Sequence, residues 1–400
     1  ENIKFNTKYY FALWVAPDES GPWTDPVESS IDSFRTPVFT RELVSYFDPL
    51  KTHDTVKAFN GTVVLFTDKK FEGTSKDTIV AYRNISLKGV ISVGTGFYFA
   101  KKEQSPAFNI GLTYDSIPAG FTEENIKMYR IKGNDIYAVF DARQDKESKM
   151  IYVNTRDLDD PFILLIDTVT PTITVKSKTL SVVTASANIY DTVSIKDNIS
   201  NLRWTYLTGK GDTVATASDS GYAGKTAQEV FLRILQSSNK ISSETGVRAY
   251  FKLSDGNNYS IADLSRQVRS REIKFYAESK SWTPNAANKI LDTLNPEALI
   301  EKFPTSDTSD FYDTRYLRMY MWAKDKNAMS KSWIEYSENT SSLFKFTPGK
   351  AVWIKTLTDF TFNMGDGVTM SLKDTQTIDL EPREYTDISL PYAFDIRFSD

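Results

Sequence analysis

Three aspartates stand at three-residue spacing in the last third of the chain. Asp307, Asp310 and Asp313 lie in a stretch made largely of Ser, Thr and Asp. Carboxylate oxygens grouped in a loop suit Ca²⁺, which takes about six to eight oxygen ligands. The stretch lacks the glycine and the bidentate glutamate of an EF-hand loop. Two interpretations stay open, a calcium site or a solvated loop before a strand, and we favour the second.

A group of aromatic side chains follows in the same region. Its members are Trp322, Trp333 and Trp353, with Tyr320, Tyr336 and Phe344. The three tryptophans are candidates for carbohydrate binding, because exposed flat rings stack on sugars and Trp tolerates partial exposure. However, Tyr320 and Trp322 have the same parity in one predicted strand, and a one-sided apolar row also fits a sandwich core. We expect core positions for most of these aromatics, with a saccharide-binding surface as the alternative.

The composition excludes most familiar catalytic chemistry. The 400 residues contain no cysteine and a single histidine, His53. Disulfides, thiol nucleophiles, iron–sulfur clusters, cysteine zinc sites and two-histidine metal sites are therefore excluded. Lys and Arg total 48 against 52 Asp and Glu, a net charge of −4, which argues against a nucleic-acid-binding protein. We expect no enzyme, no catalytic residue and no cofactor, with calcium at the aspartates above as the alternative.

The elements that would position these residues are predominantly strands. Apolar and polar residues alternate with period two, and Gly, Pro, Asn or Asp interrupt the alternation about every 8–12 residues. This pattern predicts an all-β fold of tandem antiparallel β-sandwich, immunoglobulin-like domains. Residues 8–16 predict a strand that is apolar on both faces, which needs a covering layer because an exposed edge of this kind recruits other chains.

Two segments predict short added helices. Thr226 and Glu229 form a capping box, and the apolar residues after them recur at helical spacing, which predicts a helix near 226–236. Asn295 as N-cap and Pro296 in the first turn predict a second helix that ends at Pro304. Both helices would pack on a sheet.

Changes in composition divide the chain into four predicted parts. They are 1–38, a terminal hairpin; 39–166, a β-sandwich; 167–278, an immunoglobulin-like domain with the first helix; and 279–400, a β domain with Trp-bearing strands. No run approaches the roughly 20 apolar residues that span a bilayer, so we expect no membrane span. We expect the natural polypeptide to extend before Glu1, which is not an initiator residue.

Several segments resemble known β modules. The alternation of residues 6–16 resembles the penultimate strand of a fibronectin type III domain, and the segment to residue 36 would complete its last hairpin. Residues 40–166 resemble the ZU-five sandwich of ankyrins and bacterial surface proteins, on the phrases at 108–120 and 122–130. That resemblance implies an interaction or structural module; the Trp often found near Ile136 in the family is absent here.

The second half of the chain resembles bacterial modules as well. From Asp167 it resembles a bacterial immunoglobulin-like domain, with Trp204 on a predicted buried strand. Residues 348–353 read Pro-Gly-Lys-Ala-Val-Trp and resemble the C-terminal regions of large proteins from Gram-negative bacteria with type IX secretion. The whole order resembles the distal region of such a modular surface or secreted protein.

The functional expectation follows from these resemblances. We expect a non-enzymatic structural or adhesive segment of a bacterial cell-surface or secreted protein, such as a stalk, an adhesin or a surface-filament component. Its partners would be other domains of the same polypeptide or neighbouring surface proteins, and its location extracellular. The alternative is a carbohydrate-binding accessory region of a polysaccharide-degrading enzyme, with polysaccharide as the partner.

Overall fold

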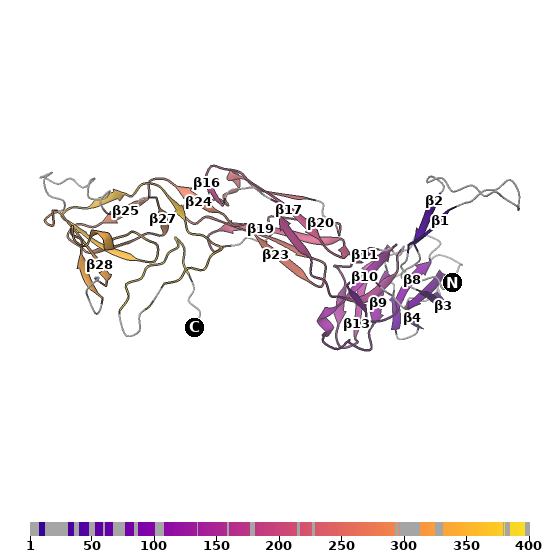
Figure 1. Cartoon of the computed structure of the whole chain (residues 1–400). Coiled ribbons are helices and arrows are strands. Elements are labelled where there is room, and N and C mark those ends of the chain that lie inside the picture. The colour runs from indigo at the N-terminus through magenta and orange to yellow at the C-terminus, as the bar shows by residue number, and fades with distance from the viewer. Residues whose placement is uncertain are drawn as a thin grey trace.

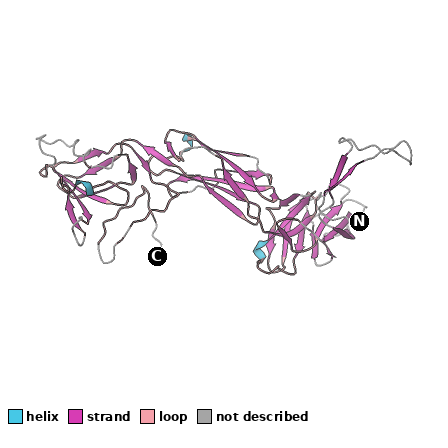
Figure 2. Cartoon of the chain, viewed as in Figure 1, coloured by secondary structure: helices cyan, strands magenta, loops and turns pink. Residues whose placement is uncertain are grey.

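In the part of the chain that the structure describes, nearly all regular secondary structure is β-strand, and most strand pairings are antiparallel. A computed structural model describes residues 8–12, 31–35, 40–47, 53–58, 61–66, 77–83, 87–100, 108–133, 135–157, 160–176, 181–213, 217–225, 229–292, 296, 313–324, 331–378, 380 and 385–396. The helices in these residues are single 3₁₀ turns: η2 (Glu123–Asn125), η3 (Gln236–Ser238) and η4 (Ser341–Leu343). Figure 2 shows how little of the chain they occupy. The predicted all-β sandwich class is confirmed.

The first unit is a sandwich of two sheets. One sheet has the order β18 (Ile199–Ser200), β11 (Asp135–Ala138), β10 (Ile126–Lys132), β14 (Phe162–Asp167), β8 (Gly96–Ala100), β6 (Asp77–Arg83) and β3 (Thr40–Phe47), with β7 (Val90–Ser92) also on β14. The other has the order β12 (Arg143–Asp145), β13 (Met150–Thr155), β9 (Phe108–Thr113), β5 (Gly61–Phe66) and β4 (His53–Ala58). Alternate inward residues of the two sheets form a common core.

The second unit also has two sheets. They are β15 (Thr172–Val175), β17 (Ile189–Lys196) and β21 (Val230–Ile234), and β20 (Asp219–Ala223), β19 (Leu202–Lys210), β22 (Val247–Ser254) and β23 (Tyr259–Asp263). Its core includes Tyr129, Ile163 and Leu165 from the first unit. In addition, β18 pairs in parallel with β11, which joins the two units by backbone hydrogen bonding. The junction between the units is therefore part of a core.

The third unit has its own core, and three sheets contribute to its region of the molecule. They are β26 (Thr283–Ala286), β30 (Ala351–Thr356), β28 (Leu317–Ala323) and β29 (Ser332–Glu335); β25 (Lys274–Ala277) and β31 (Phe360–Asn363); and β16 (Val182–Thr184), β24 (Gln267–Ser270), β32 (Gly367–Thr369) and β27 (Lys289–Leu291). Strand β16 thereby attaches a segment of the middle of the chain to strands of the last part.

The units follow one another in a row, with the chain's early residues at one end and β25 and β28 at the other (Figure 1). Strands β1 (Lys8–Ala12) and β2 (Ile31–Arg35) pair antiparallel in a separate two-stranded sheet. Within the described ranges, no helix has the length and apolar character required to cross a bilayer.

The predicted helix near 226–236 is wrong. Val230–Ile234 is strand β21, which pairs antiparallel with β17. Val230, Leu232 and Ile234 are buried, whereas Phe231 is 74% exposed. Burial therefore alternates from one residue to the next along these five residues, as it does in a strand. Pairing with β17 overrides the helical capping signal of the sequence. The second predicted helix, 295–304, lies outside the described residues apart from Pro296, which is in a turn.

A pair of substitutions distinguishes the strand from the helix. On a helix Phe231 would face the core with Val230 and Ile234, but on β21 it faces solvent. We expect Phe231→Ala to change the free energy of unfolding by no more than about 0.5 kcal/mol. Leu232→Ala should cost about 2–5 kcal/mol, because it leaves a cavity in the second core. Urea denaturation measures both; equal costs would contradict the strand.

Candidate functional site

The candidate site lies on the outer face of the sheet β26-β30-β28-β29. Strand β28 alternates strictly, with Leu317, Met319 and Met321 buried and the residues between them less buried. Tyr320 and Trp322 therefore point away from the core that the methionines enter. Trp353 and Trp333 lie on the same outer face, because Tyr320 is directly opposite Trp353 and Trp322 is directly opposite Trp333.

This placement corrects the expectation that most of these aromatics form the core. Trp322 and Trp353 are half-buried, and Trp333 is 50% exposed. Tyr336 and Phe344 do occupy the core as expected, at 1% and 0% exposure. The error has a simple cause. Both faces of strand β28 carry large apolar side chains, and Leu317, Met319 and Met321 fill the interior instead of the larger rings.

The rings form a walled hollow instead of a flat platform. Trp333 meets Trp322 at 5.3 Å and 73°, and Trp353 at 6.0 Å and 86°, measured between ring centroids and planes. Trp282, which the sequence analysis did not single out, meets Tyr320 at 5.0 Å and 88°. Trp282, Tyr320, Trp333 and Trp353 line a hollow of about 410 Å³. This volume falls in the range of about 300–1,000 Å³ that is typical of small-molecule sites.

Residues near the C-terminus occupy the polar edges of two of the rings. The indole N–H of Trp322 donates to the backbone carbonyl of Tyr385 at 2.6 Å. The indole N–H of Trp353 donates to a carboxylate oxygen of Asp387 at 2.5 Å. With Trp333 and Thr386, these residues line a second hollow of about 320 Å³. Since both donors are satisfied, the rings are fixed and their faces are left for apolar contact.

A charged group borders the hollow beside Tyr320. Arg318 Nε is 2.7 Å from a carboxylate oxygen of Glu335, and the Tyr320 hydroxyl donates to the other oxygen at 2.6 Å. The hydrogen bond from Arg318 lowers the pKa of Glu335. Burial, followed by the hydrogen bond to Glu335, raises the pKa of Tyr320. The tyrosine is therefore held as a neutral donor beside an ionised carboxylate.

Acidification should remove the contribution of the Arg318–Glu335–Tyr320 group to the free energy of unfolding. Because the folded pKa of Glu335 lies below its ordinary value of 4.5, the interaction stabilises the fold above that pH and is lost as the pH falls through the lowered pKa. Both side chains are partly exposed, so the contribution should not exceed about 1 kcal/mol. Urea denaturation of Glu335→Gln, followed by tryptophan fluorescence, should show a deficit at pH 6 that shrinks by pH 3. A deficit independent of pH would contradict this origin.

The three aspartates of the predicted calcium loop cannot all be placed. Asp307 and Asp310 lie outside the described residues. Asp313 is described, and Arg315 donates to both of its carboxylate oxygens at 2.7–3.2 Å, while the backbone N–H of Arg315 adds a bond of 2.9 Å. These bonds lower the pKa of Asp313. Its carboxylate is thus engaged in a turn and an ion pair beside β28.

A sequence signal for Trp282 does exist in retrospect, since Trp282 directly precedes the strand that pairs with β30. Its role depends on that pairing, which no local spacing reveals.

No protein-family model matches the chain, and no curated protein matches it. The site must therefore be interpreted from its own geometry.

Proposed function

We propose that this chain is a non-enzymatic adhesive segment of a bacterial cell-surface or secreted protein, and that its third unit binds saccharide in the aromatic hollow. The observation that carries the proposal is the outward position of Trp282, Trp333 and Trp353 on a sheet face whose inward residues already fill a core. The surface location rests on the resemblances to bacterial surface modules. The row of units supports a role in holding the binding face away from an attachment point.

Saccharide fits the chemistry of the hollow. The C–H faces of a sugar ring are apolar and its edges carry hydroxyls, so it matches aromatic walls with a polar border. Here the walls are four aromatic side chains, and Glu335, with Arg318, supplies hydrogen-bonding groups next to Tyr320. Hydroxyl groups of a bound sugar would reach these polar atoms while its ring contacts Trp333 and Trp353.

The perpendicular rings favour one second candidate, a quaternary ammonium group. Such cations bind in aromatic cages through attraction to ring faces. However, Lys355 Nζ lies 5.6 Å from the ring centroid of Trp282 and brings a positive charge to this wall. That charge opposes a cationic ligand but not a neutral sugar, so the geometry supports saccharide better.

Binding of the full chain to soluble glycans and insoluble polysaccharides tests the proposal. Trp333→Ala should weaken binding at least about tenfold, since loss of an aromatic anchor at a binding centre costs about 2 kcal/mol or more. Trp333 is the first choice because its half-exposed ring leaves the core intact. Phe231→Ala is the matched control, since it removes an exposed aromatic from the second unit and should leave binding unchanged.

Two results would overturn the saccharide assignment. One is the absence of binding to every glycan tested, together with binding of choline or trimethyl-lysine that Trp333→Ala abolishes. The other is glycan binding that survives both Trp333→Ala and Trp353→Ala, which would place the saccharide on another surface.

A further inference from the structure

A second group of functional atoms lies at the junction between the first and second units. Asp167 ends β14, Asp197 directly follows β17, and Asp255 directly follows β22. One carboxylate oxygen from each lies within 4.8 Å of the other two. The side-chain amides of Asn257 and Asn258 donate to the backbone carbonyl of Asp167, at 2.9 and 3.2 Å. The loop after β22 is thereby fastened to the end of β14.

Each of the three carboxylates accepts hydrogen bonds at only one of its two oxygens. Oδ1 of Asp167 accepts from the backbone N–H of Val169 at 3.1 Å, and Oδ1 of Asp197 accepts from that of Asn198 at 2.8 Å. Oδ1 of Asp255 accepts two backbone N–H bonds, of 2.7 and 2.6 Å. In all three residues Oδ2 is buried and has no hydrogen-bond partner. Three buried, unpaired carboxylate oxygens therefore belong to one small region.

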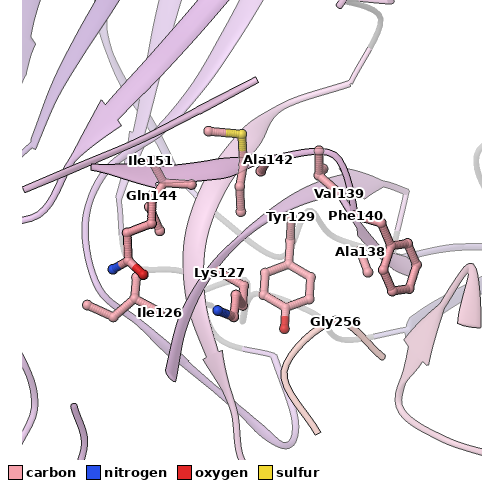
Figure 3. Close-up of a pocket in the computed structure, with 11 residues that line it drawn as sticks. Ile126, Lys127, Tyr129, Ala138, Val139, Phe140, Ala142, Gln144, Ile151 and Gly256 are labelled. Atoms are coloured by element: carbon pink, nitrogen blue, oxygen red, sulfur yellow. The ribbon is translucent and has the colours of Figure 1, made fainter. Parts of the chain in front are cut away.

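Two further side chains supply independent observations. The hydroxyl of Tyr129 has no hydrogen-bond partner, although the residue is 0% exposed. Figure 3 shows this hydroxyl directed toward the loop at Gly256, next to Asp255. Oδ1 of Asn198 is also buried and unpartnered, while Nδ2 of the same amide donates to Asp167 at 3.1 Å. Buried polar atoms in native proteins nearly always have a partner, so five unpaired oxygens in these neighbouring residues indicate an absent ligand.

The charge of the cluster is not balanced within the described part of the chain. None of the three aspartates forms an ion pair with a lysine or arginine there. A cation is the group that this environment lacks.

We propose that Asp167, Asp197, Asp255 and Asn198 bind one calcium ion at the junction of the first two units. Four unpartnered protein oxygens, all carboxylate or amide, form a hard-donor set that suits Ca²⁺, and water would complete its coordination. An ion-bound water would also give the Tyr129 hydroxyl a hydrogen-bond partner. The proposal departs from the expectation of no cofactor and places calcium away from Asp307, Asp310 and Asp313.

Calcium at this position would hold the two units together. Asp167 belongs to a strand of the first sandwich, whereas Asp197 and Asp255 follow strands of the second unit. Gly89, which directly precedes β7 of the first unit, also lies beside the end of β14. Its carbonyl accepts a hydrogen bond from the backbone N–H of Thr168 at 2.9 Å. The ion would add a charged link to a junction that already shares a core.

Calorimetric and thermal titration of the full chain, after treatment with a chelator, tests the site. CaCl₂ should bind one ion per chain and raise the first melting transition by about 5–10 °C when its concentration is about 100-fold above Kd. The double variant Asp197→Asn/Asp255→Asn should melt no lower than the chelated wild type, because it removes repulsion between buried charges. CaCl₂ should not raise the melting temperature of this double variant.

Asp313→Asn is the matched control, since it alters an aspartate of the predicted loop, and it should retain the full calcium response. Three results would overturn the proposal. The first is a wild-type chain that shows neither heat nor a melting shift with CaCl₂. The second is loss of the response in Asp313→Asn with retention in the double variant. The third is an equal response to MgCl₂ at the same concentration, which would remove the assignment to calcium.

Discussion

Replacing Arg266 with methionine is expected to lower the free energy of unfolding of the second unit by about 3–5 kcal/mol. Arg266 Nη2 lies 2.7 Å from Asp191 Oδ1, and the two side chains are 6% and 0% exposed. The substitution would leave the Asp191 carboxylate buried and without its cation. Urea denaturation measures the loss. Arg269→Met is the control, because its ion pair with Asp292 is 40% and 50% exposed and should contribute no more than about 1 kcal/mol.

The double variant Asp191→Leu/Arg266→Met should recover most of this loss. Replacing a buried ion pair by apolar side chains of similar volume is often neutral or stabilising. Here the pair is incompletely satisfied, since Asp191 Oδ2 and Arg266 Nε are buried without partners. If the double variant were no more stable than Arg266→Met alone, an unpaired charge would not be the cause of the loss.

Leu165→Ala is expected to cost about 2–5 kcal/mol and to loosen two units at once. All six residues of β14 are buried. Leu165 belongs to the core shared with the second unit, whereas its neighbour Leu164 belongs to the core of the first sandwich. A cavity at Leu165 should therefore affect both sides of the strand.

Hydrogen exchange of the full chain measures where the loss occurs. Leu165→Ala should speed exchange in β10 of the first unit and in β19 and β22 of the second. Ile261→Ala, at a residue 56% exposed on β23, should change stability by no more than about 0.5 kcal/mol and leave the exchange of β10 unaltered. Faster exchange in the second unit alone would show that the shared strand does not couple the two.

The candidate binding face was only partly predictable. The sequence places Trp322, Trp333 and Trp353 near one another, but parity alone does not say which face of a strand is covered. In β28 both faces carry large apolar side chains, and the choice between them was made by the neighbouring sheet, which packs on the Met319 side. The same limit applies to Val230–Ile234, where a helical spacing of apolar residues coexists with alternation and pairing to β17 decided the outcome.

The calcium cluster shows a limit of another kind. Asp167 opens an Asp-Thr-Val sequence, Asp197 precedes Asn198, and Asp255 precedes Gly256. No spacing relates the three, because each lies at the end of a different strand or directly after it, and only the packing of the second unit on β14 brings one carboxylate oxygen of each within 4.8 Å of the others. The aspartates at positions 307, 310 and 313 have the more regular spacing in the sequence, yet Asp313 is paired with Arg315.

The sequence by itself determined the all-β class, the exclusion of cysteine and multi-histidine chemistry, and the concentration of tryptophan in the last part of the chain. These properties follow from composition and from a period of two, which are local. The tertiary structure decided which face of each strand is buried, which strands the units share, and which distant carboxylates meet. Those outcomes depend on pairings between residues far apart in the chain, and their free energy comes from contacts that no short segment contains.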